Sequence, residues 1–321
     1  MKRISWLAAA CVAGWAAARL AAADRWRPIE APAAPLLSFT PHVTAAALLS
    51  PLVLRRKGPA ATAALAGAAL AAVILPRTLQ RPQPMTRGPV LRVITANLMH
   101  GHADEEALVG LVRRCGADVL FLQELTETAV IGLKQAGLTD LLPHEIVDVR
   151  GASARGSGIY ARYPLGNGLT IRPISIAQPT ARLQLPGGRP ADLICVHPHP
   201  PKPPWSRRYA ARWREELTVL PPPAVPGAEP PRVLAGDFNA TADHAYFRDL
   251  LRLGHVDAAS QVGKGLAATW APWGAHGGPG LLTIDHVLVD PGCAVQAVSV
   301  HPLPGSDHRA VYAEFRLPSA R

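Results

Sequence analysis

Short apolar runs rich in β-branched residues alternate with helical patterns from Val90 onward, and this alternation limits the possible folds more than any other feature. The predicted strands are Val90–Ala96, 118–123, 181–185, 191–196, 232–236, 284–289 and 310–317. Between them, Asp104 and Thr126 each precede apolar residues at helical spacing, as helix N-caps do. Many short strands and few helices in about 230 residues predict an α/β fold, with two packed sheets covered by helices.

Residues 1–75 have a different pattern, with three largely apolar stretches at 4–23, 36–54 and 60–75. About 20 apolar residues are needed to cross a bilayer as a helix. We therefore predict a membrane region at 1–75 with about three transmembrane helices. A signal peptide, or only one or two spans, is the competing interpretation. The proline-rich segment 76–89 is predicted to be an extended linker, and 90–321 a separate folded domain.

The net charge of +10 first suggests a nucleic-acid partner, but its location argues against one. Residues 1–75 hold eight basic and two acidic residues, a net +6, which leaves +4 for the other 246. The positive-inside rule places Lys2, Arg3 and 55–57 in the cytoplasm. This predicts a multi-pass protein of the cell membrane with its folded domain outside the cytoplasm. Arg77 and the arginines after it do not fit this rule.

Polar residues lie at the ends of predicted strands at five places and inside a predicted strand at a sixth, Asp285. They are Asn97, Gln123–Glu124, His197, Gly236–Asn239, Asp285 and Ser306–His308. One such residue would usually be a turn former, but six places with carboxylates, amides and histidines need a common explanation. Glu124 and Asp307 are hard oxygen ligands of the kind that Mg²⁺ or Mn²⁺ prefers.

The remaining polar residues suit phosphoester cleavage. His308 could deprotonate an attacking water if Asp285 fixes its tautomer. His197 and Asn239 could donate hydrogen bonds to phosphoryl oxygens as charge grows on them. The sequence contains no serine nucleophile elbow, P-loop or zinc-protease motif that would indicate another chemistry.

The order of these motifs resembles the endonuclease/exonuclease/phosphatase (DNase I-like) superfamily. The resemblance spans about 90–317 and rests on Ile94-Thr-Ala-Asn97, Phe121-Leu-Gln-Glu124, Gly158-Ile-Tyr-Ala-Arg-Tyr-Pro164, Val196-His197, Gly236-Asp-Phe-Asn239, Thr283-Ile-Asp285 and Gly305-Ser-Asp-His308. It implies a four-layer α/β/β/α sandwich and a metal-dependent hydrolase. It also implies that Glu124 is the principal ligand of Mg²⁺ (or Mn²⁺), with Asn97 and Asp307 near the metal.

The same resemblance implies the catalytic residues. His308 resembles the general base, oriented by Asp285. Asp237 and Asn239 resemble the pair that positions the nucleophilic water and binds phosphate, and His197 resembles the histidine on the leaving-group side. Family mechanisms differ in which of these residues transfers which proton, so the roles are less defined than the positions.

Three further residues are candidates for substrate binding. His199 could line the site beside His197, although a proline-stiffened strand exit explains it equally well. Arg208 and Arg212 share one face of a predicted helix and could meet an anionic substrate or lipid headgroups, or lie on a solvated surface. A loop around Trp270 could face the substrate or the membrane.

Three apolar stretches before such a domain resemble the membrane-anchored bacterial members associated with glycopeptide (vancomycin/teicoplanin) resistance. The resemblance implies a phosphohydrolase that cleaves phosphoester or pyrophosphate bonds at the outer membrane face, with undecaprenyl pyrophosphate-type lipid carriers as substrates and the bilayer as partner. An exported nuclease, phospholipase or sphingomyelinase of the same fold is the alternative. A nucleic-acid substrate is less favoured, a non-catalytic binding protein less still, and the sequence indicates no protein partner.

Overall fold

Two six-stranded mixed sheets pack face to face in the computed structural model, which describes residues 2–54, 56–149, 155–169, 171, 176–187 and 190–319. The first sheet has the order β11 (Ala294–Pro302), β12 (Arg309–Arg316), β1 (Val90–Asn97), β2 (Val119–Leu125), β4 (Gly156–Ala161) and β3 (His144–Asp148). The second has the order β5 (Leu165–Asn167), β6 (Thr180–Leu183), β7 (Ala191–Val196), β8 (Arg232–Asp237), β10 (Asp285–Val289) and β9 (Val256–Asp257).

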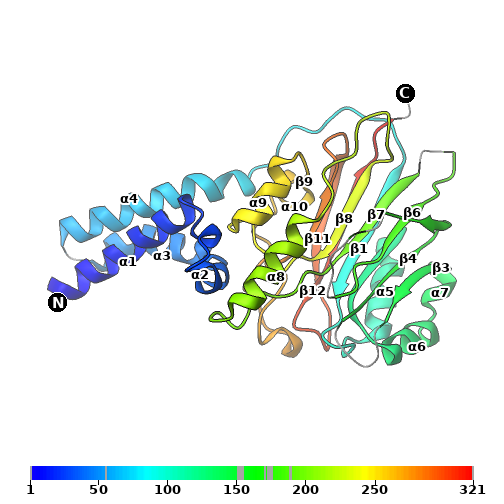
Figure 1. Cartoon of the computed structure of the whole chain (residues 1–321), viewed down its shortest axis with the longest axis horizontal. Coiled ribbons are helices and arrows are strands. Elements are labelled where there is room, and N and C mark those ends of the chain that lie inside the picture. Colours follow the sequence, from blue (N-terminus) through cyan, green and yellow to red (C-terminus); the bar gives the residue numbers. More distant parts are fainter. Residues whose placement is uncertain are drawn as a thin grey trace.

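Helices cover both outer faces of the sheet pair (Figure 1). The first sheet carries α5 (Glu105–Cys115), α6 (Glu127–Gln135) and α7 (Leu138–Leu141), and the second carries α8 (Arg207–Thr218) and α9 (Ala245–Arg252), with the short α10 (Ala258–Gln261) after β9. Separate apolar clusters fill the space between the sheets and the space under each helical layer. The predicted four-layer sandwich is therefore confirmed.

The helices α5 and α6 begin at the capping residues that the sequence predicts. Asp104 and Thr126 cap α5 and α6, because their side chains accept hydrogen bonds from the first turn, at Ala107 N and Ala129 N. Gly116 ends α5 in the left-handed conformation. The predicted hairpin of 181–185 and 191–196 forms as β6 and β7, although residues 188 and 189 of its turn lie outside the described residues.

The strand arrangement brings the polar residues to one edge. Each sheet has one parallel pair, β1 with β2 and β7 with β8, so the carboxyl ends of all four strands lie at that edge. The antiparallel neighbours β12 and β10 begin at the same edge, just after His308 and at Asp285. Residues scattered over more than 200 positions therefore meet at one end of the sandwich.

Four α-helices precede the sandwich, and the longest of them extend away from it (Figure 1). They are α1 (Lys2–Leu20), α2 (Glu30–Leu37), α3 (Thr40–Val53) and α4 (Lys57–Ile74). Small residues allow close packing, since a Cβ added to Gly67 of α4 would lie 2.9 Å from the Cβ of Ala47 on α3. The segment Lys57–Arg77 is long and apolar enough to span a membrane, and α2 with α3, bent by 67°, could form one more span. The prediction of three spans is therefore not confirmed.

A buried carboxylate joins this helical region to the sandwich. Asp243 Oδ1 accepts hydrogen bonds from Arg19 Nε (2.6 Å) and Arg77 Nη2 (2.7 Å), and its Oδ2 accepts one from Arg77 Nη1 (2.8 Å). Burial acts to raise the pKa of Asp243, but the hydrogen bonds and charges of both arginines outweigh burial and lower it. This contact gives Arg77, which does not fit the positive-inside rule, a structural role in holding the helical region on the sandwich.

Three more contacts hold the helices on the sandwich. Asp24 accepts a hydrogen bond of 2.6 Å from Ala245 N and so caps the N-terminus of α9. Glu30 on α2 forms an ion pair of 2.5 Å with Arg214 on α8. The linker, though extended, is also bound to the sandwich, because Gln83 Oε1 accepts a hydrogen bond from Val295 N (2.9 Å). The helical region and the sandwich therefore form one packed unit.

Replacing Asp243 should destabilise this unit strongly. Asp243→Ala leaves Arg19 and Arg77 buried without their partner, which typically costs about 3–5 kcal/mol. The matched control is Arg252→Ala, which removes an exposed ion pair with Asp249 and should cost less than about 1 kcal/mol. Chemical unfolding in detergent measures both values. Equal effects of the two variants would show that the buried cluster does not hold the helices in place.

The contribution of Asp243 should also depend on pH. Its pKa is lower in the folded protein than in the unfolded chain, where it is about 4. The stabilisation is therefore fully present above about pH 4 and is lost as the pH falls through the folded value. The difference in unfolding free energy between the wild type and Asp243→Asn should be constant around neutral pH and shrink below about pH 4. A difference that grew with acidity would contradict this assignment.

Candidate active site

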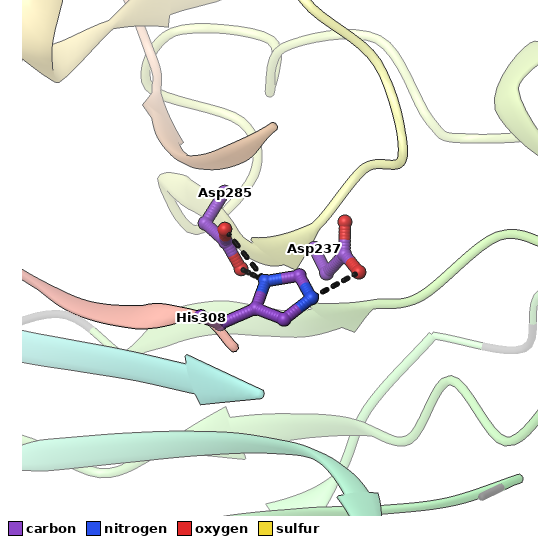
Figure 2. A group of neighbouring side chains, drawn as sticks. All are labelled: Asp237, Asp285 and His308. Carbon is purple, nitrogen blue, oxygen red and sulfur yellow. Dashed lines mark hydrogen bonds and ion pairs between the residues drawn. The ribbon is translucent and has the colours of Figure 1, made fainter. Parts of the chain in front are cut away.

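His308 lies between two buried aspartates at the strand edge, as Figure 2 shows. Its Nδ1 donates to the Asp285 carboxylate at 3.0 and 3.1 Å, which leaves Nε2 facing Asp237 Oδ2 at 3.7 Å. Thr269 Oγ1 accepts a hydrogen bond of 3.1 Å from the backbone N–H of Asp285 and so fixes the start of β10. Asp285 therefore fixes the orientation of the imidazole and directs Nε2 toward Asp237. Burial acts to lower the pKa of His308, but the charges of Asp285 and Asp237 outweigh burial and raise it to about 10. A divalent cation at these carboxylates would lower this pKa and free Nε2 to accept a proton.

Asn97 connects the two sheets at this edge. Its Nδ2 donates to Glu124 Oε1 (3.2 Å) on β2 and to Asp237 Oδ2 (3.1 Å) on β8. Its Oδ1 accepts a hydrogen bond from Met99 N at 2.9 Å. In this arrangement Asn97 presents its N–H groups, rather than its oxygen, to the carboxylates and serves as a bridge between them.

Glu124 adopts an uncommon backbone conformation for a non-glycine residue, with φ of 54°. It sits where β2 departs from regular pairing with β4, and its Oε2 accepts a hydrogen bond from His100 N at 2.8 Å. Burial acts to raise the pKa of Glu124, but nearby His197 and the hydrogen bonds from Asn97 and His100 outweigh burial and lower it. Glu124 is therefore held as a carboxylate at the site.

The turn after β8 presents Asp237 and Asn239 together. A Cβ at Gly236 would overlap the carbonyl of Val196, so only glycine permits β7 and β8 to approach this closely. Asn239 has φ of 47°, its backbone N–H donates to Asp237 Oδ1 (2.8 Å), and its Nδ2 donates to the carbonyl of Pro198 (3.0 Å). These contacts fix the loop that carries both residues.

His197 is buried at the end of β7 and stays uncharged at neutral pH. Burial lowers the pKa of His197 to about 4. Its backbone N–H donates to Gln178 Oε1 (3.2 Å), while its Nδ1 has no hydrogen-bond partner among the described residues. A neutral imidazole beside Glu124 can donate a hydrogen bond to a substrate oxygen without adding a positive charge.

These side chains open into one pocket of about 490 Å³. The pocket is lined by Glu124, His197, His199, Asp237, Asn239, Asp307 and His308, by Arg155 and Lys202, and by Pro35, Ser38 and Phe39 of the helical region. Trp270 Nε1 donates to Asp307 Oδ2 at 2.8 Å, and Lys202 Nζ lies 5.6 Å from the centre of the Trp270 ring. The loop around Trp270 therefore does face the pocket.

Of the three residues predicted to bind substrate, one lines the pocket and two do not. His199 lines the pocket and stacks on Tyr209 with ring centres 4.6 Å apart. Arg208 and Arg212 are not among the lining residues, because they lie on α8, where Arg208 is exposed. Arg212 is close enough to His199 to contribute to lowering the pKa of that imidazole, although burial is the main cause.

The residues present fit a divalent cation. Four carboxylates, from Glu124, Asp237, Asp285 and Asp307, gather around His308, and in the described part of the chain no lysine or arginine forms an ion pair with them. Burial, with Asp285 and Glu124 nearby, raises the pKa of Asp237 against the opposing effect of His308. Asp237, Asp285 and His308 offer ligand atoms within 4.8 Å of one another. A hard cation would offset this excess of negative charge.

A family model described as "Endonuclease/Exonuclease/phosphatase family" matches residues 94–308, from the start of the Ile94 motif to His308. The chain belongs to this family. Its members are hydrolases that act on phosphoester bonds and generally use divalent metals. No curated protein sequence matches this chain.

Solved structures show the same fold. An endonuclease/exonuclease/phosphatase from Beutenbergia cavernae is 20% identical with a TM-score of 0.53, covering 73% of each chain. A humanized TDP2 of D. rerio is 18% identical with a TM-score of 0.55, covering 71% of this chain and 99% of its own. A functionally unknown conserved protein from Enterococcus faecalis is 19% identical with a TM-score of 0.52, covering 70% and 99%. At these identities the likeness concerns the fold.

Several residues at the site were not predicted from the sequence. Gln178 has no neighbouring motif and acts on the site by accepting a hydrogen bond from the backbone N–H of His197. Thr269 lies in the predicted loop around Trp270, but the hydrogen bonds that it accepts from the backbone N–H groups of Ile284 and Asp285 were not predicted. Pro35, Ser38 and Phe39 lie in the helical region, where the sequence indicated only a membrane span. His100, with φ of 57°, follows directly after the Asn97 motif, and this proximity is the one signal that could have identified it.

The His308–Asp285 pair gives a direct test of the site. His308→Gln should lower kcat by about 10²–10⁴, the usual contribution of a general acid or base. His301→Gln is a matched control, because His301 lies on β11 and its imidazole contacts Ser299. Thermal unfolding of both variants separates loss of chemistry from loss of fold. An equal loss of activity in both variants would contradict the assignment.

Proposed function

We propose that this protein is a membrane-anchored, divalent-metal-dependent hydrolase that cleaves a phosphoester or pyrophosphate bond of a phosphorylated lipid at the outer membrane face. The observation that carries the chemistry is the buried His308 held between Asp285 and Asp237 beside Glu124. This arrangement supplies a base of fixed orientation next to carboxylates that suit Mg²⁺ or Mn²⁺.

The chain's own residues have distinct parts in this reaction. His308 Nε2, directed by Asp285, would take a proton from the attacking water beside Asp237. His197 and Asn239 would donate hydrogen bonds to phosphoryl or leaving-group oxygens. Glu124, with Asp307, would hold the cation, which supplies Lewis-acid stabilisation of the negative charge that develops on the phosphoryl group.

The position of the helical region supports a lipid substrate and membrane anchoring. The helices expose large apolar side chains, among them Ile4, Leu7, Leu49, Leu52 and Leu65. Exposed apolar surface of this extent is typical of membrane contact. The same helices contribute Pro35 and Phe39 to the pocket, so the catalytic residues would work beside the bilayer surface.

A pyrophosphate lipid carrier of the undecaprenyl type is the substrate we favour within this class. Resemblance to the membrane-anchored members associated with glycopeptide resistance supports that choice, and so does the outward orientation inferred from the charges around the apolar stretches. A nuclease, phospholipase or sphingomyelinase activity would use the same catalytic residues, so the substrate has to be compared directly.

The full-length chain in detergent should be given undecaprenyl pyrophosphate, sphingomyelin and plasmid DNA in parallel, with Mg²⁺ or with chelator. The full chain is required because helical-region residues line the pocket. We expect phosphate release from the first substrate alone, abolished by chelator. Nicked plasmid alone would contradict the lipid proposal, and so would cleavage of sphingomyelin alone.

Asp237→Ala and His308→Ala serve as the catalytic controls for this assay. Both should remove metal-dependent turnover while leaving the protein folded enough to stay soluble in detergent. Full activity in both variants would contradict the site assignment, because no other cluster of this kind occurs in the described part of the chain.

A further inference from the structure

A second cavity adjoins the active-site pocket. It has a volume of about 320 Å³ and shares two lining residues, Ser38 and Leu282, with the catalytic pocket. Ser38 lies at the corner between α2 and α3, and Leu282 lies just before Asp285 in the chain. Since the same two residues border both spaces, the second cavity lies directly beside the catalytic pocket.

This second cavity follows α3. One wall is formed by Pro41, His42 and Ala45 of α3, and the opposite wall by Leu266, Leu281 and Leu282 of the loops before β10. From Pro41 to Ala45 this wall extends over roughly 6 Å of helix. We call this cavity the α3 groove. Arg77 and Asp243 also border it, but they are paired with each other, so their charges are already satisfied.

The α3 groove has apolar surface at both of its ends. At the catalytic end, Phe39 and Pro35 border the pocket next to the polar residues. Beyond Ala45, α3 continues to Leu52 and Val53, whose side chains are 83% and 77% exposed. Figure 1 shows α3 extending away from the sandwich together with α1 and α4. Exposed apolar residues of α3 therefore lie beyond one end of the groove, and the catalytic pocket lies at the other.

We propose that the α3 groove binds the hydrocarbon chain of a phosphorylated lipid while its phosphate lies at His308 and Glu124. This inference rests on the proposed function and identifies residues that would select among phosphorylated lipids. The α3 helix would then contribute to substrate specificity, because burial of a longer hydrocarbon chain in the groove is more favourable. The 67° bend between α2 and α3 contributes to this arrangement, because Ser38 and Phe39 at the bend line the catalytic pocket.

Filling the groove tests this proposal. Ala45 is an exposed residue of α3 that lines the groove, and the adjacent Ala46 is equally exposed but does not line it. Ala45→Phe should lower kcat/KM for undecaprenyl pyrophosphate by about tenfold, the loss expected when about two methylene groups can no longer be buried. The matched control Ala46→Phe should leave it unchanged.

Isopentenyl pyrophosphate is the second probe, because its short chain does not reach along α3. Both variants should hydrolyse it as the wild type does, which also shows that they are folded. Wild-type activity of Ala45→Phe on undecaprenyl pyrophosphate would contradict hydrocarbon binding in the α3 groove while leaving the proposed function intact. Equal kcat/KM of the wild type for both probes would also contradict hydrocarbon binding in the groove, again without contradicting the proposed function. Failure of the wild type to release phosphate from either probe would overturn the proposed function itself.

Discussion

The Asn97 side chain connects the two halves of the active site, and the arrangement of the other catalytic residues depends on this link. Its amide bonds Glu124 in one sheet and Asp237 in the other. Both carboxylates lie at the carboxyl ends of parallel strands, so the site exists only because the two parallel pairs end at the same edge. The apolar cluster between the sheets holds this alignment, and the amide then sets the spacing of the two carboxylates.

Much of the fold and the site could be predicted because the signals are local. A polar residue after an apolar run marks a strand end, and parallel strands place such ends together. The helix caps at Asp104 and Thr126 are equally local. Such patterns brought Asn97, Glu124 and His308 into one predicted site. Arg208 and Arg212 were less certain, because sharing a helix face does not establish which direction that face points.

The relation of the helical region to the sandwich could not be predicted, because it depends on pairs far apart in sequence. Arg19 and Arg77 lie 224 and 166 positions from Asp243. In the sequence alone, a lone arginine in an apolar stretch is indistinguishable from a charge at the membrane surface. The prolines of the linker suggested a spacer, whereas the hydrogen bond from Val295 N to Gln83 holds it against the sandwich.

The loop after β8 connects the helical region to the catalytic residues. Asn239 is followed within five residues by His244, which accepts a hydrogen bond from Thr241 N through Nδ1 (2.8 Å). With that nitrogen accepting, Nε2 carries the proton and donates to the carbonyl of Ala34 on α2 (2.5 Å). The helical region therefore supports the backbone that positions a catalytic residue.

Charge is distributed within the pocket in a way that suits an anionic substrate. The carboxylates lie at its centre, while Arg155 and Lys202 are exposed residues of its lining. Exposed cations attract a phosphate group through water, whereas buried carboxylates would repel it without a cation between them. A divalent cation held by Glu124 and Asp307 would offset this repulsion.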